Sequence, residues 1–188
     1  MLIKDCPNHS DEELVSLTLT NQDYFYCLVS RYEAKLNRYL GRLGLNSPSD
    51  REDVLQNTFL KAYRNLNGFN FDFKFSSWIY RITHNESVSF FRRSKGLRFS
   101  LSLSPEDLSQ LASSENMEFN FDFKNKFTEF KKALTNLDSK YKDVIILKFL
   151  EDKSYEEISD IIKKPTGTVA TLISRGRREL KKQLKKYE

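Results

Sequence analysis

The sequence predicts an all-α protein made of two small helical domains that are joined by a flexible linker. Apolar residues recur at spacings of three and four over most of the chain, and only six glycines and four prolines interrupt its 188 residues. No apolar–polar alternation persists long enough to build a sheet, and the nearest candidate, residues 70–75, is short. We therefore expect a first domain at 1–94, a linker at 95–126 and a second domain at 127–188.

Three helices are predicted in the first domain. Residues 22–43 place their apolar side chains on one face, as an amphipathic helix does. A second helix is expected to begin near Ser49, because Ser49 and Glu52 have the spacing of a capping box. A third is expected from about Ser76 to Arg93, with an apolar stripe that includes Trp78 and Val88. The extreme N-terminus is expected to fray.

The linker and the second domain differ sharply in pattern. Residues 95–126 are rich in serine and lack a clean period, which predicts a flexible strap with a short helix after Pro105. Residues 134–186 read as a helix-turn-helix. Its first helix opens at Ser154, which forms a capping box with Glu157. After the breakers Pro165 and Gly167, the last helix has one apolar stripe and an opposite polar and basic side.

Charge and composition narrow the function. The formal net charge is +5, and residues 127–188 hold 15 lysines and arginines against 10 aspartates and glutamates. This excess coincides with the helix-turn-helix and indicates DNA as a partner. No 18-residue apolar run and no charged-then-apolar leader is present, so no membrane insertion or signal peptide is expected. Cys6 and Cys27 have no metal or disulfide pattern, which predicts free thiols in a reducing cytoplasm.

Enzymatic chemistry is not expected. The only histidines, His9 and His84, lie far apart, and the sequence has no glycine-rich phosphate loop or metal-ligand cluster. Cys6 and His9 have a ligand-like spacing, but a structural zinc needs four ligands. We therefore predict neither a cofactor nor a metal.

Two blocks together resemble the extracytoplasmic-function (ECF) sigma factors of bacterial RNA polymerase. Residues 50–93 are similar to the region 2 of this family, with an acidic and apolar stretch from Glu52 to Gln56 and an aromatic core from Phe75 to Asn85. Residues 134–180 are similar to its region 4. The resemblance implies a transcription initiation factor that binds core polymerase, recognises the −10 and −35 promoter elements and helps to open the promoter. It also allows an anti-sigma protein as a partner.

The resemblance implies three groups of site residues. A docking surface for the polymerase β′ clamp falls on Asp50, Glu52, Asp53, Gln56 and Asn57. The −10 element is expected to bind a loop and helix that combine aromatic and cationic side chains, as single-stranded DNA requires. The residues implied are Phe71, Phe73, Lys74, Arg81, His84 and Asn85. The −35 element is expected to bind the recognition helix, at Thr168, Thr171, Ser174, Arg175 and Arg178.

Four residues depart from the family pattern and leave the promoter preference open. Glu86 stands where an apolar residue is common, and Ser89 stands where an aspartate is common. Ala170 and Leu172 stand where the family often has cations.

The residues alone also allow other classes of protein. A stand-alone helix-turn-helix regulator would use residues 1–94 for dimerisation or sensing, and would bind its DNA without polymerase. A protein-binding adaptor would not need the basic recognition helix.

Overall fold

The computed structural model describes residues 6–94, 101–113 and 123–185. Within these ranges all regular structure is helical and no strand occurs, so the all-α prediction is confirmed. The chain divides into two compact units, the first made of residues 1–40 and 47–97, the second of residues 41–46 and 98–188. The middle of the expected linker, residues 114–122, lies outside the described residues.

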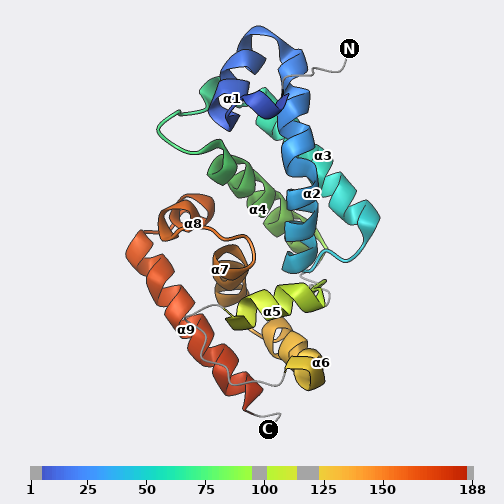
Figure 1. Cartoon of the computed structure of the whole chain (residues 1–188), viewed down its shortest axis with the longest axis vertical. Helices are drawn as coiled ribbons and strands as arrows, with labels where there is room; N and C mark the ends of the chain where they lie inside the picture. Colours follow the sequence, from blue (N-terminus) through green and yellow to red (C-terminus); the bar gives the residue numbers. More distant parts are fainter. Residues whose placement is uncertain (1–5, 95–100, 114–122, 186–188) are drawn as a thin grey trace. The chain divides into compact units, whose positions relative to one another are not determined.

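The first unit is built on four helices, drawn from blue to green in Figure 1: α1 (Asp11–Thr20), α2 (Phe25–Leu43), α3 (Pro48–Arg64) and α4 (Phe75–Arg93). Short 3₁₀ turns, Cys6–Asn8, Gln22–Tyr24 and Leu66–Gly68, stand before α1, α2 and the loop to α4. The three predicted helices are therefore confirmed, with small shifts at their starts. The α3 helix begins at Pro48, because the Ser47 hydroxyl rather than Ser49 accepts the capping bond, from the Asp50 backbone N–H at 3.3 Å.

Helix α1 was not predicted, because we expected the N-terminus to fray. Its start is fixed by a capping box: the Ser10 N–H donates to Glu13 Oε2 at 2.7 Å, and the Glu13 N–H donates to Ser10 Oγ at 3.2 Å. Leu14 and Val15 are fully buried, which anchors α1 in the core. The sequence carries this signal in Ser10-x-x-Glu13, so α1 could have been found.

The expectation of free thiols is wrong. Cys6 and Cys27 form a disulfide, with their Cα atoms 5.3 Å apart, a separation typical of such bonds. The 3₁₀ turn at Cys6 folds back onto α2, where Cys27 is almost fully buried. Two cysteines 21 residues apart give no sequence signal of this pairing, because the folding-back alone brings them together.

The second unit contains α5 (Pro105–Ser113), α6 (Phe123–Thr135), α7 (Ser139–Phe149), α8 (Tyr155–Ile162) and α9 (Thr166–Leu184). Helix α5 confirms the short helix expected after Pro105. The α9 helix, red in Figure 1, packs against α6, α7 and α8. The last residues of α2, from Gly41 on, belong to this second unit, and among them the nearly buried Arg42 guanidinium pairs with Asp107 at 2.5 Å and with Glu151 at 2.6 Å. Two carboxylates thus balance one buried cation.

Close packing of α7 and α9 depends on Gly176. A Cβ atom built at this position would lie 3.0 Å from Ile145 Cδ1 and 3.1 Å from Tyr141 Cβ. A side chain here would therefore hold the two helices apart.

Candidate nucleic-acid interface and docking groove

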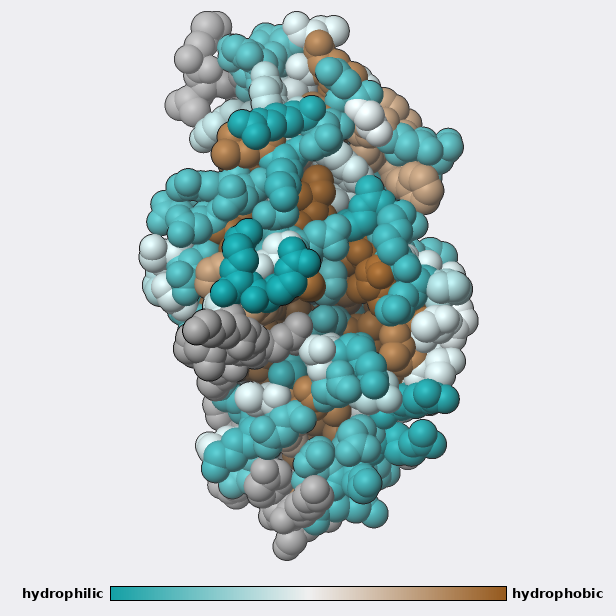
Figure 2. Space-filling view, turned by 180° about the vertical axis from the view of Figure 1, so that it is seen from behind, coloured by the Kyte–Doolittle hydropathy of each residue, from teal (hydrophilic) through white to brown (hydrophobic). Residues whose placement is uncertain are grey.

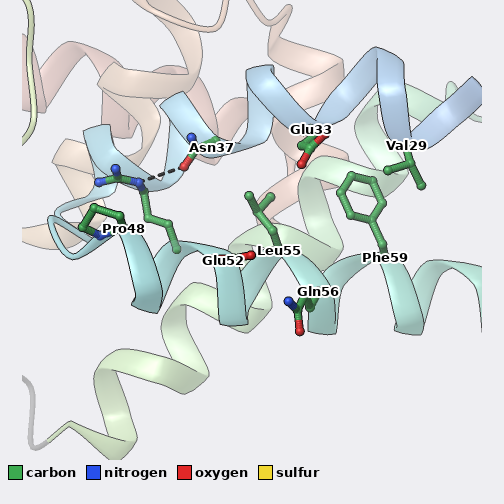
Figure 3. A pocket seen from close by; sticks show the side chains of 9 residues that line it. Val29, Glu33, Asn37, Pro48, Glu52, Leu55, Gln56 and Phe59 are labelled. Carbon is green, nitrogen blue, oxygen red and sulfur yellow. Dashed lines mark hydrogen bonds between the residues drawn. The ribbon is translucent and has the colours of Figure 1, made fainter. Parts of the chain in front are cut away.

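A groove runs between α2 and α3 in the first unit (Figure 3). Its volume is about 470 Å³. Apolar side chains of Val29, Leu55 and Phe59 share it with polar ones, and the Arg51 Nε–H donates across it to Asn37 Oδ1 at 2.8 Å. The complete lining is Val29, Glu33, Asn37, Pro48, Arg51, Glu52, Leu55, Gln56 and Phe59. A mixed apolar and polar groove of this kind suits a protein segment as its occupant.

The five residues predicted for polymerase docking do not all face this groove. Glu52 and Gln56, one helical turn apart, line it. Asp53 and Asn57 are exposed on the adjoining strip of α3, where the Asn57 side-chain N–H donates to the Asp53 carbonyl at 2.8 Å. Asp50 lies in the first turn of the helix and is half-buried. The predicted patch is therefore one continuous edge of α3, with the groove on one side.

The loop before α4 presents two aromatic rings and buries a third. Phe69 is buried, and its ring packs edge-on against those of Phe71, Phe75 and Trp78, with centroids 5.1, 5.9 and 5.5 Å away. Phe71 and Phe73 remain 51% and 44% exposed. On the face drawn in Figure 2, most of the surface is hydrophilic and apolar residues reach it only in patches. Phe71 and Phe73 are among the large apolar side chains that are exposed, and both stand on this one loop.

Hydrogen bonds give this loop a defined turn. The Asn70 side-chain oxygen accepts from the Asp72 N–H at 2.9 Å, and the Asn70 carbonyl accepts from the Phe73 N–H at 3.1 Å. An asparagine that closes a turn in this way is a common device for fixing a loop. The loop can thus hold its rings in place for a partner.

Helix α4 continues from the loop with a polar face. Arg81 is half-buried and Asn85, one turn further, is exposed. His84 is also half-buried, and its Nδ1 lies 3.3 Å from the Tyr39 hydroxyl of α2. Val88, expected in the core, is 42% exposed. The correction follows from the helical pitch, because Val88 is seven residues from Arg81 and shares its face.

Glu86 points away from this face. It is buried, and Oε1 accepts from Lys61 Nζ of α3 at 2.5 Å. Sequence reasoning treated Glu86 as a departure that could alter base preference, whereas in the structure it joins two helices. Ser89 is half-buried.

The helix-turn-helix forms as predicted. The Ser154 hydroxyl accepts from the Glu157 N–H at 3.1 Å, and Glu157 Oε2 accepts from the Ser154 N–H at 2.9 Å, which completes the capping box. Lys163 ends α8 with φ of 53°, and Pro165 then precedes α9. The buried side of α9 is formed by Val169, Ile173, Gly176, Leu180 and Leu184.

The opposite side of α9 carries every residue predicted for the −35 element. Thr168, Thr171, Ser174, Arg175 and Arg178 are all exposed. The Thr171 hydroxyl donates to the Gly167 carbonyl at 2.8 Å, so its remaining capacity is as an acceptor. Of the departures, Ala170 is exposed, whereas Leu172 is half-buried beside the apolar stripe. The basic side continues along α9 to its exposed lysines Lys181, Lys182 and Lys185.

Sequence reasoning missed two features near these sites. One is the α2 side of the groove, although Val29, Glu33 and Asn37 are spaced by four and share one helical face. The other is a bond from α1 to α4, in which the Phe75 N–H donates to Glu12 Oε1 at 2.9 Å. No sequence signal marks this second contact, because the residues are 63 positions apart.

Known families match both parts of the chain. The family model for sigma-70 region 2 matches residues 28–96, and that for sigma-70 region 4 matches residues 127–180. The chain is 30% identical over 174 residues to the ECF RNA polymerase sigma factor SigW of Bacillus subtilis (strain 168), covering 88% of this chain and 91% of that protein. It is 30% identical over 176 residues to the ECF RNA polymerase sigma-E factor of Haemophilus influenzae, covering 85% and 87%.

Among solved structures, CnrH in complex with the cytosolic domain of CnrY has a similar fold. The TM-score is 0.69 at 23% identity, over 96% of this chain and 100% of the other.

The fold and the similarities define a sigma-70-type transcription factor with regions 2 and 4. The chain belongs to the ECF RNA polymerase sigma factors, which initiate transcription and are not enzymes. This membership decides against the stand-alone regulator and the adaptor. Among the described residues, none of the helices combines the length and apolar character needed to cross a membrane.

Proposed function

We propose that this sigma factor grips its promoter at two points while docked on core polymerase through α3. In this proposal, residues 1–94 bind the polymerase and the −10 element, residues 95–126 connect, and residues 127–188 bind the −35 element. The observation that carries the proposal is that the first unit exposes aromatic rings on the loop that leads into α4, a helix with a polar face, whereas α9 exposes a basic face.

The docking surface is assigned to the α3 edge and the groove beside it. Glu52, Asp53 and Gln56 offer carboxylates and an amide to a basic partner, here the polymerase β′ clamp. Leu55 and Phe59 supply apolar floor to the same groove. Charge complementarity of this kind governs how the two proteins align and how fast they associate, more than how tightly they bind.

The −10 element is assigned to the aromatic loop and α4. Phe71 and Phe73 are exposed and can stack on unpaired bases, each stack being worth about 1–3 kcal/mol. Lys74 and Arg81 supply charge for the backbone, and the exposed Asn85 amide can pair with a base edge. His84 is assigned a positioning role in this site, because its Nδ1 lies 3.3 Å from the Tyr39 hydroxyl of α2.

The −35 element is assigned to α9 in the major groove. Arg175 and Arg178 stand one turn apart on its exposed side, with Thr168, Thr171 and Ser174 beside them. Because Ala170 carries no charge, the reading face relies on these two arginines for direct cationic contacts. The proposed place of action is the cytoplasm, with the polymerase.

An anti-sigma protein is proposed as a regulator. The related fold of CnrH is described in complex with the cytosolic domain of CnrY, and the sigma factor RpoE of Bartonella quintana is described with the anti-sigma factor NepR.

The proposal is tested by run-off transcription with core polymerase over a randomised promoter library. We expect initiation only when the chain and core are both present, and selected promoters with two conserved blocks. No polymerase-dependent initiation would refute it.

Docking is tested separately by pull-down with Glu52→Lys and Asp53→Lys. Each should weaken retention of core polymerase about tenfold, roughly 1.4 kcal/mol. Asp23→Lys changes an exposed carboxylate in the 3₁₀ turn before α2 that does not line the groove; it makes the same change of charge and serves as the control. Equal retention of all three variants would remove the α3 edge from the docking surface.

A further inference from the structure

The start of helix α4 is capped by a residue of another helix. Lys74 occupies the N-cap position and its side chain makes no capping hydrogen bond. Instead, the N–H of Phe75, the first residue of α4, donates to Glu12 Oε1 of α1 at 2.9 Å. A carboxylate is favoured here, since the first N–H groups of a helix lack internal partners and carry partial positive charge.

Phe75 also fixes the aromatic loop that precedes it. Its side chain is fully buried, and its ring lies against those of Tyr32, Phe69 and Trp78, with centroids 5.5, 5.9 and 5.6 Å away. The exposed ring of Phe73 is two residues upstream of the capped amide. The amide of Phe75 and its buried ring thus both fix the point at which the aromatic loop joins α4, in addition to the turn at Asn70.

The residues that precede Glu12 are tied to α2. Its neighbour Asp11 pairs with Arg31 of α2 at 2.5 Å and accepts a hydrogen bond from the Tyr32 hydroxyl. The other end of the Arg31 guanidinium donates to the carbonyls of Cys6 and His9, at 2.8 and 3.0 Å. Burial raises the pKa of Tyr32, with the bond to Asp11 adding to the rise, so its hydroxyl stays protonated as a donor.

The disulfide closes this arrangement. Cys6 is covalently joined to Cys27, which is one turn of α2 before Arg31. Residues 6–12 are thus tied to α2 at two places, by the S–S bond and by Arg31. Without the disulfide the covalent tie at Cys6 is lost, and what remains are the polar contacts of Arg31 and Tyr32, the ring contact of His9 with Tyr24 and the buried side of α1.

We propose that Glu12 is a positioning residue for the aromatic loop, and that the Cys6–Cys27 disulfide keeps it in place. The grip of Phe71 and Phe73 on single-stranded DNA then depends on the redox state of this cysteine pair. This inference rests on the proposed −10 function of the loop.

The chemistry of the switch is a two-electron exchange. Hydrogen peroxide oxidises the two thiols, which lose their protons and form the S–S bond, while the peroxide O–O bond breaks and two molecules of water are released. A dithiol reverses the step by thiol–disulfide exchange and is itself oxidised to a disulfide. Exchange begins at Cys6, which is partly exposed, because Cys27 is buried.

The first test measures hydrogen exchange of the Phe75 amide in the full chain, which requires no DNA. Reduction of the wild-type chain with dithiothreitol should speed this exchange about tenfold, the effect expected for losing a helix cap. Glu12→Ala should do the same in the oxidised chain, and Glu12→Gln should restore most of the protection because its amide oxygen still accepts. Asp23→Ala, an exposed carboxylate in the 3₁₀ turn before α2, is the control.

The second test measures binding of a fluorescent pool of random single-stranded oligonucleotides to the holoenzyme. Reduction should weaken binding about threefold to tenfold, and Cys6→Ser should bind like the reduced chain and no longer respond to dithiothreitol. Phe71→Ala separates the two proposals: if it leaves binding unchanged, the −10 assignment of the loop fails, whereas the exchange data still judge the role of Glu12.

An equal rate of Phe75 exchange in the oxidised and reduced wild-type chain would overturn the redox link. This comparison needs no variant, so it holds even if Glu12→Ala does not fold. Wild-type exchange and wild-type binding in a folded Glu12→Ala chain would overturn the positioning role.

Discussion

The ion pair between Lys61 and Glu86 allows a prediction that separates stability from promoter recognition. Glu86 is 8% exposed at its side chain, whereas Lys61 is 55% exposed, and their charged atoms lie 2.5 Å apart. Removing one partner of a fully buried pair costs about 3–5 kcal/mol, and exposed pairs contribute about 0–1 kcal/mol. Because water reaches the lysine end, we expect Lys61→Met to cost about 2 kcal/mol.

The loss arises from the carboxylate that stays behind. Lys61→Met leaves Glu86 buried without its cation, whereas Lys61→Met with Glu86→Leu removes both charges. Replacing a buried pair by apolar residues is often neutral. We therefore expect the double variant to unfold within about 1 kcal/mol of the wild type, so that the two substitutions are strongly non-additive.

The assay is urea unfolding followed by fluorescence. The single tryptophan, Trp78, lies on α4, so its emission reports the first unit. Arg64→Met, an exposed cation on the same helix α3, should change the free energy of unfolding by less than about 1 kcal/mol. A Lys61→Met chain as stable as this control would refute the reasoning.

The same variants test the direction in which Glu86 points. Since its carboxylate faces α3, Glu86→Leu should leave the bases selected in the run-off library unchanged. A new preference in the −10 block would place Glu86 at the DNA after all.

Two further predictions concern the second unit. Arg178→Ala should weaken DNA binding by the holoenzyme and lower the slope of log affinity against log salt by about one, as measured by titration at several salt concentrations. The control is Lys140→Ala, which removes an exposed cation paired with Asp138 and should leave the slope unchanged. An unaltered slope in Arg178→Ala would remove Arg178 from the interface. Gly176→Leu should destabilise the packing of α9 on α7 by about 1–3 kcal/mol, because the leucine side chain would meet Ile145 and Tyr141. Unfolding in urea is followed by circular dichroism. Gly167→Leu, with open space at its Cβ position, is the control, and equal effects of the two substitutions would contradict the steric argument.

Local signals made much of the fold predictable. The capping box at Ser154 and Glu157 and the apolar stripe of α9 depend only on residues within a few turns, so the sequence contains them in full. For the same reason the exposed side of α9 could be predicted, including Arg175 and Arg178. Helix α1 carries an equally local signal at Ser10 and Glu13, which was overlooked.

Other features required the tertiary structure, because they join residues that no period connects. Val88 has an apolar side chain but lies on the polar face of α4, and Phe69 is buried while Phe71 and Phe73, in the same loop, are not. The sequence marks all of these residues as apolar or aromatic, and only packing decides which of them water reaches.

The sequence by itself therefore determined the helices, the helix-turn-helix and the family, since these depend on short-range spacing and on motifs. The tertiary structure decided the partners of isolated polar groups: Glu86 with Lys61, Glu12 with the Phe75 amide, and Cys6 with Cys27. A buried charge or a helix end must find a partner. The partner is the group that lies nearest in space, and because these partners are 21 to 63 positions apart in sequence, only the folded chain brings them together.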